Sequence, residues 1–559
     1  EALARVEPER VDGAARAAPL ITETEELLAD IWASALERDS VGATDNFFAL
    51  EGDSLTAAEI AAEVHATFGV EIELGGFVES PTVAAMAELV DRRQAGGDSS
   101  APEPLTSIPR DAPLRCSLIQ ERTWQQSRTL EGSTRYTVAR GVQILGPLDI
   151  GALRRSVDRL VARHEVLRTT FAERDGELVQ IVHPPGPVEI PLIEVDSAEA
   201  ADELLREEAA APFDLERGPL LRLLLVRLQE DEHRLLRLNH HIISDGRSWE
   251  VFFEELILLY EADRRGEPPP LPAERPLQYA DFAAWEHRTL RPDSRRWRED
   301  VAWWRANLDG VPLRTPLPFA RREPDERAPA ADGVAWLPVP PRLTTDLESL
   351  RREQGATYFM VRFAAFAALL AIMSDNSDLV IGTYTTTRRQ VDTRDIFGFF
   401  ANPVALRLRF EGNPGFRDWV GEVRAAVIEM SAHARIPYEA LWEELHAAGV
   451  SPPHIHAIFS VSDPMRPARF AGLEMTPLDR FYPSMPWGLT IQPRREWYGE
   501  RCLAAFDATV LHPRAVRIFL KRYRQLLERI CAEPDRPLRE LVPRRSRRFG
   551  PLLRRRLVS

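Results

Sequence analysis

Two adjacent histidines followed by an acid are the residues of this chain whose types and spacing best suit chemistry. His240, His241 and Asp245 lie in the stretch NHHIISDGRSWEV, residues 239–251. A neutral imidazole, with a pKa of about 6.5, suits a general base for a nucleophile that carries an N–H or O–H group. Asp245 could orient such an imidazole or hold the turn through an ion pair. The alternative is that both histidines are structural.

The flanking segments predict how this stretch is held. HRLLRLN (233–239) is predicted to be a buried strand, and SWEVFFEELILLY (248–260) an amphipathic helix. Gly246 is expected at the tight point of the turn between them. Neighbouring side chains on a strand point to opposite faces, so the two histidines cannot have the same role. One is expected to be packed and hydrogen-bonded, and the other to face a cavity.

A second candidate is Ser54, in DNFFALEGDSLTAAEI. Gly52 breaks the chain there and Ser54 opens a predicted helix. A serine at a helix start commonly serves as the N-cap. The same position also favours a phosphate, through unpaired backbone N–H groups and the helix dipole. The position alone favours the cap, although it would also suit attachment of a phosphodiester-linked group.

Length and composition limit the class of protein. A chain of 559 residues should divide into several domains. Its net charge of −15 argues against a general nucleic-acid binder. The cysteines are few and scattered, which argues against a disulfide framework or a zinc site; they are Cys116, Cys502 and Cys531. No signal peptide or long apolar stretch is seen, so a cytoplasmic protein without a membrane partner is expected.

Hydrophobic periodicity predicts a small helical domain, with Thr22 as the N-cap of its first helix, followed by a long α/β region of alternating strands and helices. A Pro- and charge-rich break near 310–335 suggests two lobes, and the basic tail is read as a solvated end. The predicted segments are a linker (1–18), the helical domain (19–95), a flexible linker (96–112), an N-terminal lobe (113–310), a C-terminal lobe (311–545) and the tail (546–559).

DNFFALEGDSL and its three flanking predicted helices resemble peptidyl carrier domains of nonribosomal peptide synthetases over residues 20–95. In that family the serine of a (G/E)G(H/D)SL stretch receives 4′-phosphopantetheine. The resemblance implies that Ser54 is the attachment site of this cofactor, placed there by a phosphopantetheinyl transferase.

HHxxxDG resembles the signature of condensation domains of the same synthetases. Further stretches match that family's motifs in order, namely SLIQERTW (117–124), RHEVLRTTF (163–171), YADFAAW (279–285), IGTYTTTRRQVDTRDIFGFFANPV (381–404) and HARIPYEAL (433–441). The resemblance implies an α/β fold of two chloramphenicol-acetyltransferase-like lobes, with the histidine pair midway along a tunnel. It also implies peptide-bond formation between carrier-bound peptidyl and aminoacyl thioesters. The stretch HHIISDG most resembles that of condensation domains whose donor ends in an L-configured residue.

The resemblance assigns roles within the signature. His241 is expected to be catalytic, either as a base for the attacking amine or as a group that positions it. His240 is expected to be scaffold, and Asp245 to be structural and paired with Arg168 or Arg388.

Arg247 stands where family members frequently carry an uncharged residue. It is a candidate gate that lines the tunnel beside His241; the alternative is a side chain that faces solvent or pairs with Glu250. His454 and His456 stand at strand spacing, but no third ligand is evident, so no metal site is predicted.

Two other functions share parts of this pattern. An epimerization domain also carries HHxxxDG, but no EGHGRE-like stretch is present. A non-catalytic recruitment platform of the same fold would usually lack the second histidine. Heterocyclization is disfavoured because a DxxxxD motif replaces the histidines there. The chain is therefore predicted to be a carrier–condensation didomain cut from a longer synthetase, with adenylation and downstream carrier domains as its partners.

Overall fold

A computed structural model of the whole chain describes residues 19–96, 103–129, 136–273, 275–318, 320, 333–461, 465–478 and 488–543. The predicted linker (1–18) and tail (546–559) lie outside these ranges. The chain divides into two compact units, Glu1–Pro102 and Glu103–Ser559, and the division falls within the predicted linker 96–112. Each unit is described by itself.

The first unit is helical. Its elements are α1 (Glu23–Ala35), α2 (Ser54–Phe68), α3 (Leu74–Glu79) and α4 (Val83–Ala95). Thr22 caps α1 as predicted, because its side chain accepts the Glu25 N–H in a capping box. The core centres on Phe47, whose ring lies 5.6 Å from that of Trp32 and 4.8 Å from that of Phe77. The short α3 was not predicted, because six residues with two glycines show no helical period.

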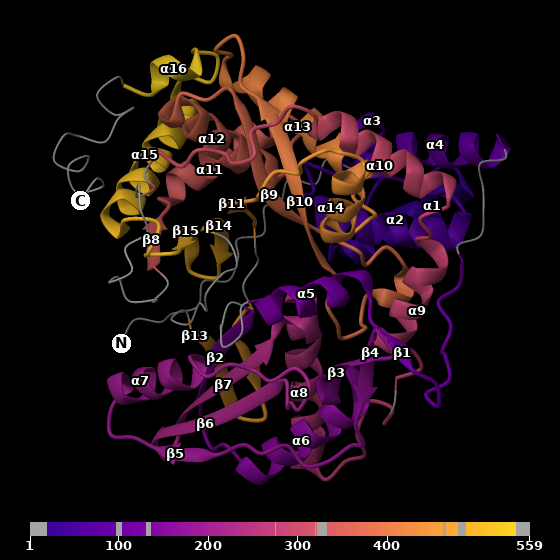
Figure 1. Cartoon of the computed structure of the whole chain (residues 1–559), viewed down its shortest axis with the longest axis vertical. Coiled ribbons are helices and arrows are strands. Elements are labelled where there is room, and N and C mark those ends of the chain that lie inside the picture. The colour runs from indigo at the N-terminus through magenta and orange to yellow at the C-terminus, as the bar shows by residue number, and fades with distance from the viewer. Residues whose placement is uncertain are drawn as a thin grey trace. The chain divides into compact units, whose positions relative to one another are not determined.

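The second unit contains a six-stranded sheet in the order β12-β13-β2-β7-β6-β5. Its strands are β2 (Thr137–Leu145), β5 (Leu192–Glu194), β6 (Leu221–Gln229), β7 (Glu232–His240), β12 (Ala468–Phe470) and β13 (Leu473–Leu478). Figure 1 labels five of these strands, β13, β2, β7, β6 and β5. β7 pairs antiparallel with β2 and β6 in the middle of the sheet.

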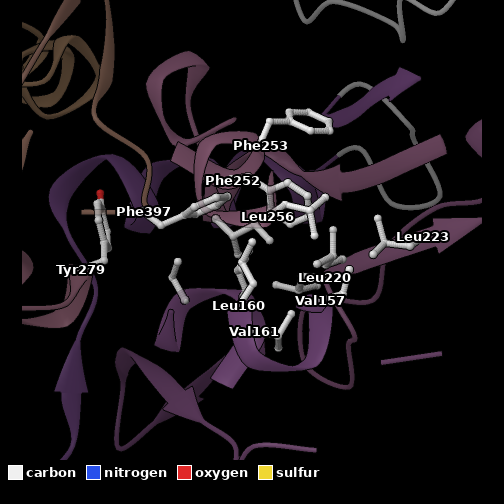
Figure 2. Packing of buried hydrophobic residues seen from close by; sticks show 14 of the residues in the cluster. Val157, Leu160, Val161, Leu220, Leu223, Phe252, Phe253, Leu256, Tyr279 and Phe397 are labelled. Carbon is white, nitrogen blue, oxygen red and sulfur yellow. The ribbon is translucent and has the colours of Figure 1, made fainter. Parts of the chain in front are cut away.

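Helices cover both faces of this sheet. On one face, Leu235 of β7 belongs to a large core with α6 (Ile150–Arg163) and α8 (Gly246–Arg265). Figure 2 shows side chains of α6, such as Leu160, pointing toward Phe252 and Leu256 of α8. On the other face, Leu236 and Leu238 pack with α7 (Ala198–Ala209). This alternation is the one predicted for a buried strand.

A second six-stranded sheet has the order β10-β9-β11-β14-β15-β8. Its strands are β8 (Gly333–Pro338), β9 (Asp378–Thr386), β10 (Ala401–Arg409), β11 (Ala457–Phe459), β14 (Leu489–Glu496) and β15 (Gly499–Phe506). The helices of this part of the chain are α11 (Pro341–Glu353), α12 (Tyr358–Ser374), α13 (Phe416–Ala432), α14 (Tyr438–Ala447), α15 (Pro513–Ala532) and α16 (Leu538–Leu541). Residues 358–373 of α12 are all buried, so α12 is the central core helix here.

A three-stranded sheet and several helices complete the unit. The sheet has the order β1-β4-β3. The remaining elements are β1 (Leu114–Arg115), β3 (Thr169–Arg174), β4 (Glu177–Val182), α5 (Leu118–Thr129), α9 (Tyr279–Thr289), α10 (Arg295–Leu308) and the 3₁₀ turns η1 (Glu165–Arg168), η2 (His241–Ile243) and η3 (Val391–Thr393).

The two sheets agree with the predicted two-lobed α/β fold, but the division predicted at residue 310 does not separate them. β13, from the C-terminal half of the chain, pairs with β2 of the first sheet. In the other direction, Trp304 of α10 donates its indole N–H to the carbonyl of His433, just after α13. Segments from both sides of residue 310 therefore contact the opposite lobe, which composition cannot reveal.

Within the described ranges no single helix is long and apolar enough to cross a membrane. The α11–α12 pair, bent by 104°, meets the length and composition limits only when both helices are taken together.

Candidate active site

The two histidines lie where β7 ends, and they differ in their surroundings. His240 is the last residue of β7 and is 6% exposed. Its Nδ1 accepts the Ile242 N–H at 3.2 Å, and its Nε2 lies 3.3 Å from the Ser127 hydroxyl. Burial, together with the adjacent His241, lowers the pKa of His240 to about 3. Both ring nitrogens of His240 are thus engaged in the neutral state.

His241 begins the turn η2 and its side chain is half-buried. Its backbone N–H donates to the Tyr136 carbonyl at 2.7 Å, and its ring lies 4.6 Å from the ring of Phe399. Among the described residues, no hydrogen-bond partner is present for the buried Nδ1 atom of His241. Burial lowers the pKa of this imidazole below its ordinary value, although Asp245 and nearby backbone groups oppose the shift. His241 is therefore neutral at physiological pH.

Asp245 is the N-cap of α8 and the partner of a buried arginine. Its Oδ1 accepts the Ser248 N–H at 2.9 Å and the Ser248 hydroxyl at 2.7 Å. Arg388 donates Nη2 to Oδ1 at 2.9 Å and Nε to Oδ2 at 3.1 Å. Burial opposes ionisation, but Arg388 and Ser248 outweigh it, so the pKa of Asp245 is lowered. Two chain segments far apart in sequence are joined at this carboxylate.

Arg388 belongs to the segment 387–400, which we call the floor segment. Its Nη1 also donates to the Ile396 carbonyl at 2.8 Å, and its guanidinium lies 3.9 Å from the centre of the Phe400 ring. The Phe400 N–H donates to Asp245 Oδ2 at 3.3 Å. Arg388 thus folds the floor segment around itself and attaches it to the histidine turn.

Two of the residues predicted to support the motif are placed differently. Arg168, the other candidate partner for Asp245, instead donates to the carbonyls of His183 and Ala162. Gly246 is exposed, is the first residue of α8 and has no left-handed φ; a Cβ added there would meet nothing within 4 Å. The backbone at residue 246 therefore does not require a glycine, in contrast to the tight turn predicted there.

Arg247 pairs with Glu250, as in the alternative to the gating hypothesis. It donates to Glu250 at 2.8 Å and to Glu254 at 3.2 Å, both on α8, and to Asp395 of the floor segment at 3.4 Å. Burial opposes its charge, but these carboxylates raise the pKa of Arg247. The gating role of Arg247 stays a prediction.

Residues from three other predicted motifs meet around the histidine turn. The Tyr279 hydroxyl lies 2.8 Å from the Ser117 hydroxyl and donates to the Phe399 carbonyl at 2.5 Å. Gln120 Nε2 donates to the Ile242 carbonyl at 3.3 Å. Stretches of sequence recognised separately therefore form one buried framework, which fixes both the turn and the residue in contact with the His241 ring.

The motif at 163–171 makes buried polar contacts with α8. Glu255 of α8 accepts a hydrogen bond from Arg163 Nε at 3.1 Å and lies 2.7 Å from His164 Nε2. All three side chains are buried. Since α8 begins at the histidine turn, this cluster holds the helix that Asp245 caps.

Sequence reasoning missed Asn239 and Ser244, which stand on either side of the histidine turn and are fully buried. Asn239 Nδ2 donates to the Ser244 hydroxyl at 2.7 Å. The available signal was position, because Asn239 directly precedes the histidine pair at the end of the strand and Ser244 directly precedes Asp245. Ser248, three positions after Asp245, carried the signal of a capping residue.

In the first unit, Ser54 is the first residue of α2. Asp53 precedes it and accepts the Thr56 N–H at 2.9 Å, so Asp53 supplies the helix cap. Capping therefore does not account for a serine at this position. Gly52 is needed for packing, since a Cβ there would lie 2.3 Å from the Phe47 ring. Attachment of a phosphate-linked group at Ser54 stays a prediction.

The His454–His456 pair does not gain a third ligand within the described ranges, where no group of three metal-binding side chains is found. The ring of His454 lies 6.2 Å from that of Trp442, which is typical of aromatic packing.

Family models match most of the chain. The model described as Condensation domain matches residues 112–548, and the one described as Phosphopantetheine attachment site matches residues 26–90. The chain is 39% identical over 432 residues to one of the proteins of the Linear gramicidin synthase of Brevibacillus parabrevis, covering 76% of this chain and 6% of that protein. It is 35% identical over 538 residues to another protein of the same synthase, covering 93% and 10%. The chain thus spans a tenth or less of these relatives.

Solved structures agree with the two-lobed fold. The X-domain from teicoplanin biosynthesis superimposes with a TM-score of 0.70 at 26% identity, covering 78% of this chain and 99% of that one.

Proposed function

We propose that this chain forms peptide bonds in a nonribosomal peptide synthetase. The chain belongs to the condensation-domain family and carries a phosphopantetheine attachment domain on the N-terminal side of its condensation domain. The acceptor's α-amine attacks the carbonyl of a donor peptidyl thioester held by the domain at 19–95. A C–N bond forms, the C–S bond breaks, and the amine loses a proton.

The different surroundings of the two histidines carry this proposal. The His240 ring is bonded at both nitrogens, and its pKa of about 3 leaves it no proton-transfer role near neutral pH. His241 is half-buried, neutral and in contact with Phe399. An imidazole in this state can accept a proton from the attacking amine or hold that amine in line with the carbonyl. A thioester is already activated, so positioning alone could supply much of the rate.

The proposed role of Ser54 is to carry the donor. When bound there, 4′-phosphopantetheine would supply the thiol to which the donor acyl group is esterified. The supporting observation is that Asp53, and not Ser54, caps α2, so Ser54 is not needed as the helix cap. A phosphopantetheinyl transferase, an adenylation domain and a downstream carrier are the proposed partners.

The test uses the full chain. A phosphopantetheinyl transferase loads it from synthetic dipeptidyl–coenzyme A compounds, an alanyl-carrier acceptor is added, and mass spectrometry follows the product. We expect tripeptide on the acceptor, no loading of Ser54→Ala, and a roughly 10²–10⁴-fold slower reaction for His241→Ala. His454→Ala, outside the site, is the matched control. Normal loading of Ser54→Ala, or an unchanged rate for His241→Ala, would contradict the assigned roles.

A recruitment platform is the second candidate. One structural neighbour, with a TM-score of 0.70, is a complex of the X-domain and OxyB from teicoplanin biosynthesis. The same assay, with chiral chromatography of the donor released from the carrier, separates the functions. An unextended donor with an inverted stereocentre would indicate epimerization, and an unchanged donor would favour recruitment.

A further inference from the structure

Arg237 of β7 is a buried cation with few contacts. It is 1% exposed, and Nη1 donates to Asn239 Oδ1 at 2.9 Å, while Nε and Nη2 have no hydrogen-bond partner within the described ranges. The same ranges contain no carboxylate paired with it, and Arg140 stands opposite it on β2. Burial, with this neighbouring arginine, lowers the pKa of Arg237 well below its ordinary value. Such a group is costly to bury, so it needs an explanation.

The contacts of Arg237 form a closed ring with three other side chains. Asn239 accepts from Arg237 and donates to the Ser244 hydroxyl at 2.7 Å. That hydroxyl also accepts the Trp249 indole N–H at 3.0 Å. The Arg237 guanidinium lies 2.8 Å from the centre of the Trp249 ring, as in a cation–π contact. We call these four residues the arginine ring.

The arginine ring spans the histidine turn. Arg237 and Asn239 precede His241 on the strand, Ser244 lies within the turn, and Trp249 is in the first part of α8. Arg237 and Asn239 lie on the same face of β7, and His241 follows directly after the strand ends, so the ring starts at the strand end that leads into His241. The Ser244 N–H also donates to the His241 carbonyl at 3.2 Å. The ring therefore connects the end of β7, the residue Ser244 within the turn, and the start of α8.

We propose that Arg237 is a positioning residue, which acts through Asn239, Ser244 and Trp249 to fix the turn that presents His241 to the reacting amine. This inference rests on the proposed function for the need to hold His241 precisely. The turn would be fixed at the expense of stability, because a buried cation with one hydrogen bond contributes little to folding. Replacing buried ionic groups by apolar groups of similar volume is often neutral or stabilising.

Arg234, three positions earlier on β7, provides a matched control. It points to the opposite face and pairs with the buried Asp202 of α7 at 2.5 Å. Arg234→Met would remove this ion-pair partner from the buried Asp202. It should therefore lower the melting temperature and leave kcat per folded molecule unchanged.

Arg237→Met should do the opposite. We expect an unchanged or higher melting temperature and a kcat lower by about 10- to 100-fold, with the KM for the alanyl-carrier acceptor unchanged. A merely structural arginine would lower the melting temperature, as Arg234→Met should. A wild-type kcat in Arg237→Met, or a kcat loss together with a lowered melting temperature, would overturn the inference.

Hydrogen exchange separates failure of this inference from failure of the proposed function. Amides of residues 241–245 should exchange faster in Arg237→Met than in the wild type or in Arg234→Met, whether or not the chain forms peptide bonds. Unchanged exchange there would overturn the inference. Absence of product from the wild type with every donor would contradict the proposed function alone.

Discussion

Replacing Asp245 by alanine should release the floor segment from the histidine turn. The side chains of Asp245 and Arg388 are each 7% exposed, so the substitution removes one partner of a buried ion pair. Such losses cost about 3–5 kcal/mol, because the remaining charge stays buried without its partner. At about 1.4 kcal/mol per tenfold, local opening should become roughly 10²- to 4 × 10³-fold more frequent.

Hydrogen exchange followed by mass spectrometry measures this opening locally. Peptides covering residues 387–400 should lose protection in Asp245→Ala, while peptides from α12, deep in the second lobe, should keep theirs. Two variants serve as controls. His241→Ala should leave the floor segment protected, and Glu299→Ala, which removes an exposed pair with Arg295 on α10, should change nothing measurable.

A double-mutant cycle tests the cause. If the pair accounts for the loss, Asp245→Ala combined with Arg388→Met should open the floor segment less often than the summed single effects predict, because no unpaired guanidinium remains. Additive effects, or a loss below about 1 kcal/mol in Asp245→Ala, would refute the reasoning, since that is the range expected of exposed pairs.

Three further predictions concern single positions. The pKa of His240 is about 3 in the folded chain and about 6.5 in the unfolded chain, so on acidification the unfolded chain binds this proton first. The free energy of unfolding should therefore fall by about 1.4 kcal/mol per pH unit below about pH 6.5. His240→Gln should flatten this slope in thermal melts recorded at acid pH. Arg247→Ala should cost less than about 1 kcal/mol in melts, since its partners are largely exposed. If Arg247 is also a gate, its loss should change the rate with carrier-bound acceptors but not with small free amines; equal effects would remove that role. Asp53→Ala should destabilise the first unit by about 1 kcal/mol, and Asp53→Asn by much less, as thermal melts of the full chain would record.

Local patterns predicted the elements that hold the site. The strand ending at His240 and the helix after Asp245 follow from hydrophobic periodicity. The opposite surroundings of the two histidines follow from the period of a strand. These features depend on neighbours in sequence, which is why one chain is enough to predict them.

Contacts between residues far apart in the sequence could not be predicted in the same way. Arg168 and Arg388 were equal candidates for Asp245, and only the folded chain brings the floor segment to that carboxylate. The return of β13 to the first sheet depends on pairing between segments that lie far apart in the sequence. The arginine ring joins a strand, a turn and a helix, so no single periodicity marks it.

The pairing of β7 with β2 decides which imidazole is presented. His240 stands opposite Thr137, so the strand ends in a fixed frame relative to its neighbour. Deleting one residue within 232–239 would exchange the faces of all that follow and turn His240 outward in place of His241. Engineers who recombine such domains therefore need junctions outside 232–245, because a chimera with the correct motif but a shifted frame would keep both histidines and present the wrong one.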